Sequence, residues 1–174
     1  MLRFITCLLF LLPSTTFAQQ WKTFNDKTIL FTAKYPADWV NQIKEGKRVF
    51  FTSPPENKTD AFFENINVSV STNPEFGTTV QVKDLVQGVV DQVKQSFTEF
   101  EEESRTFLTW NGNDACEIVY SGTSKTGDNT KVRVMQRLCF YKTRLYLVTY
   151  TALKNKDSHL ATAKQIINSI RFKP

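Results

Sequence analysis

The stretch KVRVMQRLCFYKTRLYLVTYTAL, residues Lys131–Leu153, decides the predicted fold. β-Branched and aromatic residues dominate it and no Gly or Pro interrupts it, which predicts two long strands joined at Lys142-Thr143. Pairing about this turn makes two apolar faces, with Leu138 opposite Leu147 and Phe140 opposite Leu145 on one, and Met135 opposite Tyr150 and Cys139 opposite Tyr146 on the other. Because both faces carry apolar groups, we expect this hairpin to lie in a sheet covered on both sides.

Two segments with helical periodicity are predicted to cover that sheet. Apolar residues recur every three or four positions between Val82 and Phe97, and again between His159 and Asn168. We expect Gly88 to mark a close approach of the first helix to the sheet, and Asp157 or Ser158 to cap the second helix. The fold class is therefore α+β, a single-domain α/β/α sandwich around a central antiparallel sheet.

Further strands are indicated by alternating apolar and polar residues. The turn residues Asn111-Gly112-Asn113-Asp114 predict a hairpin that runs on into the Lys131–Leu153 hairpin, so that four consecutive strands form a meander. The acidic run Glu99–Glu103 is interpreted as a solvated helix end or turn. The other expected strands are Ile29–Tyr35, Val49–Thr52, Asn65–Thr72, Thr106–Trp110, Ala115–Ser121 and Ser169–Phe172.

The first 18 residues resemble a secretory signal peptide. A single cationic residue, Arg3, precedes an apolar run that is too short to span a bilayer, and Thr16-Phe17-Ala18 ends in a small residue before Gln19. We expect cleavage between Ala18 and Gln19 and a periplasmic or extracellular protein without a transmembrane segment. The mature chain, residues 19–174, then has 156 residues, which suits one domain.

Charge argues against nucleic acid as a partner. The net charge is +5, and it falls to +4 when Arg3 is removed with the signal peptide. The basic residues are scattered along the chain, and no nucleic-acid-binding motif is found. We therefore interpret most of them as solvated surface residues.

Several pieces of the chain, in this order, resemble the PsbP-like superfamily. The pieces are Trp21-Lys22-Thr23-Phe24, Tyr35-Pro36-Ala37-Asp38-Trp39, Gly112-Asn113-Asp114-Ala115, Leu145–Thr151 and Ile166–Phe172, and they span nearly the whole mature chain. The resemblance implies the Mog/PsbP-like α/β/α sandwich, a fold shared with bacterial secreted proteins of the DcrB and LpqN type. It implies no particular function, because relatives with this fold do different jobs.

The sequence lacks the motifs of common enzymes. His159 is its only histidine, and no Gly-x-Ser-x-Gly, phosphate-loop, dinucleotide or His-Glu-x-x-His motif is found. We therefore expect no catalytic, cofactor-binding or metal-binding residues, and no cofactor. The alternative is a hydrolase-like enzyme in which Asp38, Glu64 and Asp114 converge on one cleft.

The favoured interpretation is a non-catalytic accessory, assembly or ligand-binding protein of the cell envelope, whose partner is an envelope protein or a small ligand. Trp39 follows a strand and a Pro turn, so it is expected to pack over the end of the sheet. The alternative for Trp39 is an aromatic side chain that faces a ligand.

Two cysteines, Cys116 and Cys139, remain after cleavage, and export would place them where disulfides persist. A symmetric hairpin centred between Gly127 and Asp128 sets Cys116 directly opposite Cys139, within reach of a disulfide. We therefore expect a disulfide between them. The alternative is two buried free thiols, which a register shift of one residue would require.

Overall fold

A computed structural model describes residues 19–126, 129–156 and 158–174. The predicted signal peptide, residues 1–18, lies outside the described residues. A short 3-10 helix, Glu45–Lys47, joins two of the strands. The strands are β1 (Trp21–Phe24), β2 (Phe31–Pro36), β3 (Val40–Lys44), β4 (Arg48–Thr52), β5 (Asn65–Thr72), β6 (Phe97–Trp110), β7 (Asn113–Ser124), β8 (Lys131–Tyr141), β9 (Arg144–Leu153) and β10 (Arg171–Phe172), and the helices are α1 (Val82–Lys94) and α2 (Leu160–Ser169).

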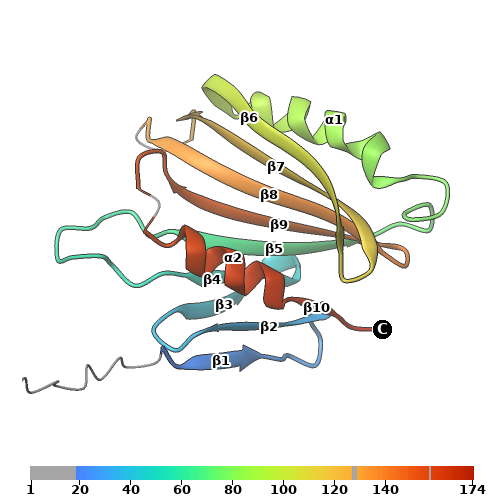
Figure 1. The fold of residues 1–174 in the computed structure, drawn as a ribbon, viewed down its shortest axis with the longest axis horizontal. Coiled ribbons are helices and arrows are strands. Elements are labelled where there is room, and N and C mark those ends of the chain that lie inside the picture. The colour runs from blue at the N-terminus through green and yellow to red at the C-terminus, as the bar shows by residue number, and fades with distance from the viewer. Residues whose placement is uncertain (1–18, 127–128, 157) are drawn as a thin grey trace, which may run out of the picture.

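A seven-stranded sheet in the order β3-β4-β5-β9-β8-β7-β6 forms the middle layer. Helix α1 covers one face over β6, β7 and β8, and α2 covers the other face beside a small sheet of β1, β2 and β10 (Figure 1). The strand pairings within both sheets are antiparallel. The predicted α/β/α sandwich is therefore confirmed, with the small sheet as an additional part of the second layer.

The β8–β9 hairpin has the predicted register. Leu138 lies opposite Leu147 and Met135 lies opposite Tyr150, so the two faces enter different hydrophobic cores. Leu138 packs in the core under α1, and Met135 packs in the larger core under α2 and β2. Two cores on one sheet explain why the strands of this hairpin are apolar on both faces.

The predicted β6–β7 hairpin is present, but its turn is shorter than predicted: it consists of Asn111 and Gly112, and Asn113 and Asp114 already belong to β7. Asn111 and Gly112 have positive φ, 52° and 78°, as a two-residue hairpin turn of the mirror-image type requires. The interpretation of Glu99–Glu103 was wrong, because these residues extend β6 toward its start. Register shifts after Thr98 and after Glu102 interrupt the alternation there, which hid the strand from periodicity.

The helices lie where predicted, but two details differ. Gly88 is exposed, and a Cβ atom added to it would meet nothing within 4 Å, so it marks no close approach to the sheet. Ser158 does not cap α2, because its hydroxyl donates a hydrogen bond to the carboxylate of Glu56. The other predicted cap, Asp157, lies outside the described residues.

The predicted disulfide between Cys116 and Cys139 is wrong. In the β7–β8 ladder Cys116 lies opposite Leu138, so the register is shifted by one residue and both thiols are buried and free. This register sets Glu117 opposite Arg137, which pairs two charges that the predicted register would have placed opposite apolar residues. Successive residues of a strand point to opposite faces, so the same shift puts the two thiols in different cores.

Candidate functional site

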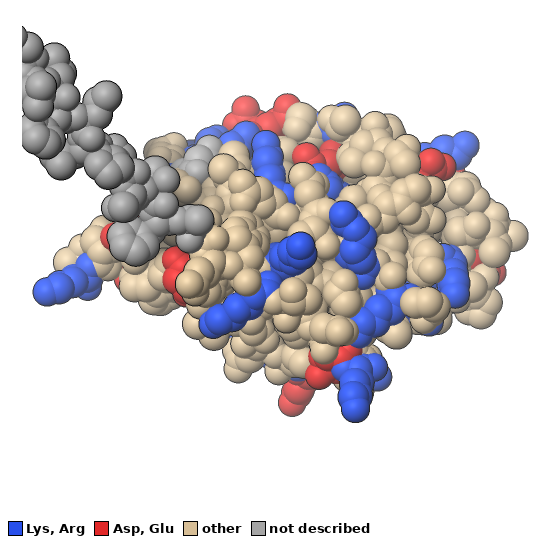
Figure 2. All heavy atoms as spheres, turned by 60° about the horizontal axis from the view of Figure 1, so that its bottom comes forward, with Lys and Arg blue, Asp and Glu red and all other residues tan. Residues whose placement is uncertain are grey.

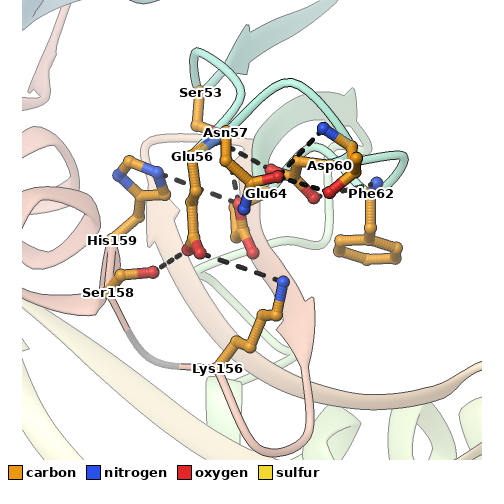
Figure 3. Close-up of polar contacts among 10 residues, drawn as sticks. Ser53, Glu56, Asn57, Asp60, Phe62, Glu64, Lys156, Ser158 and His159 are labelled. Atoms are coloured by element: carbon orange, nitrogen blue, oxygen red, sulfur yellow. Dashed lines mark hydrogen bonds and ion pairs between the residues drawn. The ribbon is translucent and has the colours of Figure 1, made fainter.

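A cluster of polar side chains lies where the loop between β4 and β5 meets the start of α2 (Figure 3). Glu64 is its buried member, with 1% of its side chain exposed. The residue immediately precedes β5, and Ser53 immediately follows β4. The Ser53 N–H donates to the Glu64 carbonyl at 2.8 Å, and the Ser53 hydroxyl donates to the Glu64 carboxylate at 3.1 Å. The end of one strand thus holds the carboxylate at the start of the next.

His159 approaches the same carboxylate from the start of α2. Its Nε2 atom lies 4.0 Å from Oε2 of Glu64, which is an ion-pair distance and too long for a hydrogen bond. The imidazole packs edge-on against the indole of Trp39, with the ring centroids 5.7 Å apart. Trp39 itself is 3% exposed and belongs to the core, so the structure places it behind the histidine and not on an open surface.

Glu56 lies on the outer side of the cluster. Its carboxylate accepts a hydrogen bond from the Ser158 hydroxyl and lies 3.9 Å from the ammonium of Lys156. Asp60 holds this part of the loop, because its carboxylate accepts hydrogen bonds from the backbone N–H groups of Glu56 and Phe62. The bond from the Glu56 N–H is the main cause that lowers the pKa of Asp60.

The three carboxylates of the enzyme hypothesis do not converge. Asp114 lines a hollow with Phe107 and residues at the start of α1, which neither Asp38 nor Glu64 enters. Asp38 and Asp114 are both exposed. The structure instead gathers Glu56 and His159 around Glu64, and the ligand atoms of these three residues lie within 4.8 Å of one another.

This constellation was missed in the sequence for a physical reason. Ser158 and Glu56 are 102 positions apart, and no spacing rule connects a loop between two strands with the start of a distant helix. The one available signal was that His159 is the only histidine of the chain. The Ser158 hydroxyl is bonded to Glu56 and not to the imidazole, so the cluster is not a Ser-His-carboxylate triad.

A second feature is the outer edge of the large sheet at β3. All five residues of β3 are exposed, including Val40 at 66% and Ile43 at 44%. The strand pairs with β4 without a register shift, and its other side has no strand partner in the described part of the chain. Lys44 and Arg48 flank a shallow hollow that includes Ile43 and Phe50.

The opposite edge of the sheet, β6, is built differently. Two register shifts interrupt its first half, and four of its carboxylates form ion pairs. These pairs are Glu99–Lys131, Glu101–Lys154, Glu102–Arg105 and Glu103–Arg133. Bulges and charged side chains are the devices by which sheets prevent edge pairing. By this comparison β3 is the more accessible edge.

Charge is distributed unevenly over the molecule. Residues 21–36 and 160–173, which contain β1, β2, α2 and β10, carry six basic residues and one acidic residue. Residues 82–110, which contain α1 and β6, carry three basic and six acidic residues. Figure 2 shows the first group as Lys and Arg side chains spread over one face, with few carboxylates among them. This face lies beside β3, as the hydrogen bond between Asn41 and the Tyr35 hydroxyl shows.

The family model for PsbP-like proteins matches residues 14–172, almost the entire chain. The chain belongs to the PsbP-like protein family. This confirms the resemblance found in the sequence. The comparison with curated proteins found no match.

Solved structures show that the PsbP-like fold is widely distributed. Cyanobacterial PsbP (CyanoP) from Synechocystis is 15% identical, with a TM-score of 0.64 over 91% of this chain and 95% of that chain. LpqN from Mycobacterium tuberculosis is 14% identical, with a TM-score of 0.61 over 89% of this chain and 91% of that chain. The Ran-binding protein Mog1p from Saccharomyces cerevisiae is 11% identical, with a TM-score of 0.59 over 89% and 96%. At these identities the likeness establishes the fold and no shared function.

Proposed function

We propose that this PsbP-like protein is a non-catalytic accessory protein of the cell envelope, exported by its first 18 residues, and that it binds another envelope protein through the β3 edge. The LpqN structure is described as that of a protein involved in cell envelope biogenesis, and Mog1p is described as a Ran-binding protein. Both descriptions are compatible with a fold that acts through binding. In the described ranges no helix is long and apolar enough to cross a membrane.

The observation that carries the proposal is the exposure of β3. Edge strands with unpaired backbone groups accept an extended segment of a partner as an additional strand. Val40 and Ile43 lie on opposite faces of β3, so an added strand would find an apolar side chain on each face. On the opposite edge of the large sheet, register shifts and ion pairs interrupt the first half of β6.

The charges around β3 define the chemistry of the partner. Lys44, Lys47 and Arg48 lie at the end of the β3–β4 hairpin, with Glu45 the acidic residue among them. Lys47 lies beside residues 28–30, at the edge of the basic face, because they line one small hollow together. An extended segment that combines apolar with acidic side chains fits such an edge. A basic segment would be repelled by the basic residues of the hairpin.

The test is affinity capture from envelopes of the producing organism. We expect a specific protein to be retained by the wild type and lost with the double substitution Val40→Lys and Ile43→Lys, which adds charge to both faces of β3. The matched control is Phe107→Lys, which changes a residue of 58% exposure on the opposite edge of the sheet. That variant is expected to retain the partner, and raised salt is expected to weaken retention.

Retention of the same partner by the β3 variant and the wild type alike would refute the proposed surface. Loss with Phe107→Lys alone would assign binding to β6. Turnover of esterase, protease, phosphatase or glycosidase substrates that is abolished by substituting Glu64 would refute the non-catalytic proposal.

A further inference from the structure

Two groups at the centre of the Glu64 cluster are buried with few partners. The Glu64 carboxylate accepts one hydrogen bond, from Ser53, among the described residues. The Nε2 atom of His159 is buried without a hydrogen-bond partner there. A buried carboxylate is stable as an anion only when hydrogen bonds or a cation compensate for its lost hydration. A cation bound between Glu64 and His159 would compensate the carboxylate and give Nε2 a partner.

The separation of the two groups fits a bound ion better than a direct hydrogen bond. Nε2 and Oε2 lie 4.0 Å apart, whereas a hydrogen bond between them needs about 2.9 Å. Zinc binds imidazole nitrogen and carboxylate oxygen at about 2.0–2.2 Å, so two ligands of a tetrahedral site are about 3.4 Å apart. A closure of roughly half an ångström, within the reach of side-chain rotation, would bring both atoms to an ion between them.

A third side chain of ligating type lies close by, and it too would have to move toward the ion. The three ligand atoms of Glu56, Glu64 and His159 lie within 4.8 Å of one another, and the close-up view shows the Glu56 carboxylate joined to Ser158 and Lys156 beside the contact between His159 and Glu64 (Figure 3). Glu56 and Glu64 come from the loop between β4 and β5, and His159 is the N-cap residue of α2. The Glu56 side chain is 24% exposed, which leaves the outer side of the space open to solvent.

We propose that Glu56, Glu64 and His159 bind one divalent transition-metal ion, with zinc as the ion that best fits the donors. One imidazole and two carboxylates, with a fourth position left for water or a ligand, are donors that zinc accepts in proteins. Calcium and magnesium prefer six or more oxygen ligands and are disfavoured by the imidazole. Bound zinc would fasten the β4–β5 loop to α2.

The Lys156 ammonium supplies a distinctive control. It lies 3.9 Å from Oε2 of Glu56 and repels a cation at the site. Removing its charge should therefore strengthen zinc binding. If the cluster only holds the start of the helix in place, the same substitution does not change the affinity of the protein for zinc.

The experiment uses the tag-free protein after treatment with a chelator, because a histidine tag would itself bind zinc. Zinc chloride is titrated by calorimetry, and the melting temperature is followed in parallel, with magnesium chloride as the comparison ion. We expect one zinc ion per chain, a melting temperature that rises with zinc concentration, and no response to magnesium. His159→Gln and Glu56→Gln are expected to weaken zinc binding by about 100-fold or more, since loss of even an outer-shell partner costs 10–100-fold.

Lys156→Gln is expected to bind zinc more tightly than the wild type. Glu101→Gln is the matched carboxylate control, because Glu101 is 65% exposed on β6. It is expected to leave zinc binding unchanged. Glu64→Gln is left as a supporting variant, because loss of a buried charge can impair folding, and the two other ligand variants keep the test decisive without it.

Absence of zinc-dependent heat and of any melting-temperature shift would overturn the proposal. Equal binding by the wild type, His159→Gln and Glu56→Gln would overturn it as well, since the ion would then bind elsewhere. This inference does not depend on the proposed partner at β3, and either can fail without the other.

Discussion

Glu117 lies directly opposite Arg137 in the β7–β8 ladder, and its carboxylate accepts two hydrogen bonds from the guanidinium, at 2.6 and 3.1 Å. Arg137 is buried, its Nη1 atom donates to Asn168 of α2 at 3.0 Å, and its guanidinium lies over the Trp110 ring. This one cross-strand pair both selects the register of the two strands and anchors the end of the helix on the sheet.

Removing the charge of Glu117 should therefore destabilise the fold. Glu117→Gln replaces the charged acceptor of a buried guanidinium with a neutral amide, so we expect a loss of roughly 2–3 kcal/mol in the free energy of unfolding. Urea denaturation measures it. Glu102→Gln is the control, because its ion pair with Arg105 is more exposed and should contribute no more than about 1 kcal/mol. Equal losses for both variants would contradict the special role of Arg137.

The second prediction concerns the two thiols separated by this register. Cys116 and Cys139 are expected to be free, so the unreduced protein should gain two alkyl adducts in guanidinium after signal-peptide cleavage. In the native state both should react slowly, because burial raises the pKa of Cys116 and raises the pKa of Cys139 to about 12. A thiol with a raised pKa stays protonated at neutral pH, and the thiolate is the nucleophile.

Mass spectrometry after alkylation provides the measurement, with and without denaturant. Adducts that appear only after a reductant is added would show that the disulfide exists and that the β7–β8 register is wrong.

Leu138 should contribute strongly to stability. Its side chain is fully buried in the core under α1, opposite Leu147. Leu138→Ala is expected to cost about 2–5 kcal/mol of the free energy of unfolding, from lost burial and the remaining cavity. Phe107→Ala, at an exposed position of β6, should change it by less than about 1 kcal/mol. Thermal denaturation of both variants is the measurement, and a small effect at Leu138 would show that the hairpin is not central.

Gly88 offers a stabilising substitution. It lies on the exposed side of α1 with nothing within 4 Å of an added Cβ atom, so Gly88→Ala should stabilise the protein by about 0.5–1 kcal/mol. Gly112→Ala is the contrasting variant. Gly112 has a φ of 78° in the β6–β7 turn, so alanine at this position should destabilise the protein. Urea denaturation compares the two, and destabilisation by Gly88→Ala would indicate a contact that the fold does not show.

Export is tested by the mass of the mature protein. We expect the chain to begin at Gln19 and to be found in the periplasm or the medium, because residues 1–18 have the composition of a signal peptide. Intact-mass measurement of protein isolated from its producing organism is decisive. Retention of residues 1–18, or a mass increment of lipid size, would contradict the prediction.

The sequence by itself determined the layers and the β8–β9 register. Apolar residues on both faces of Lys131–Leu153 require two covering layers, and a short turn at Lys142-Thr143 leaves one register that pairs Leu138 with Leu147. The β7–β8 register could not be predicted in the same way. The connecting loop is longer and both faces of the strands are apolar, so hydrophobic pattern did not distinguish two registers one residue apart.

The opposite charges of Glu117 and Arg137 indicate which of the two registers forms, since buried charges are placed opposite each other in preference to apolar residues. Only the tertiary structure decided the Glu64 cluster. Glu56 and Glu64 come from the β4–β5 loop and His159 from the N-cap of α2, which no local rule brings together, and they meet because α2 packs on the sheet beside that loop. Local periodicity specifies which face of an element is buried, whereas contacts between elements far apart in the chain depend on how the layers pack.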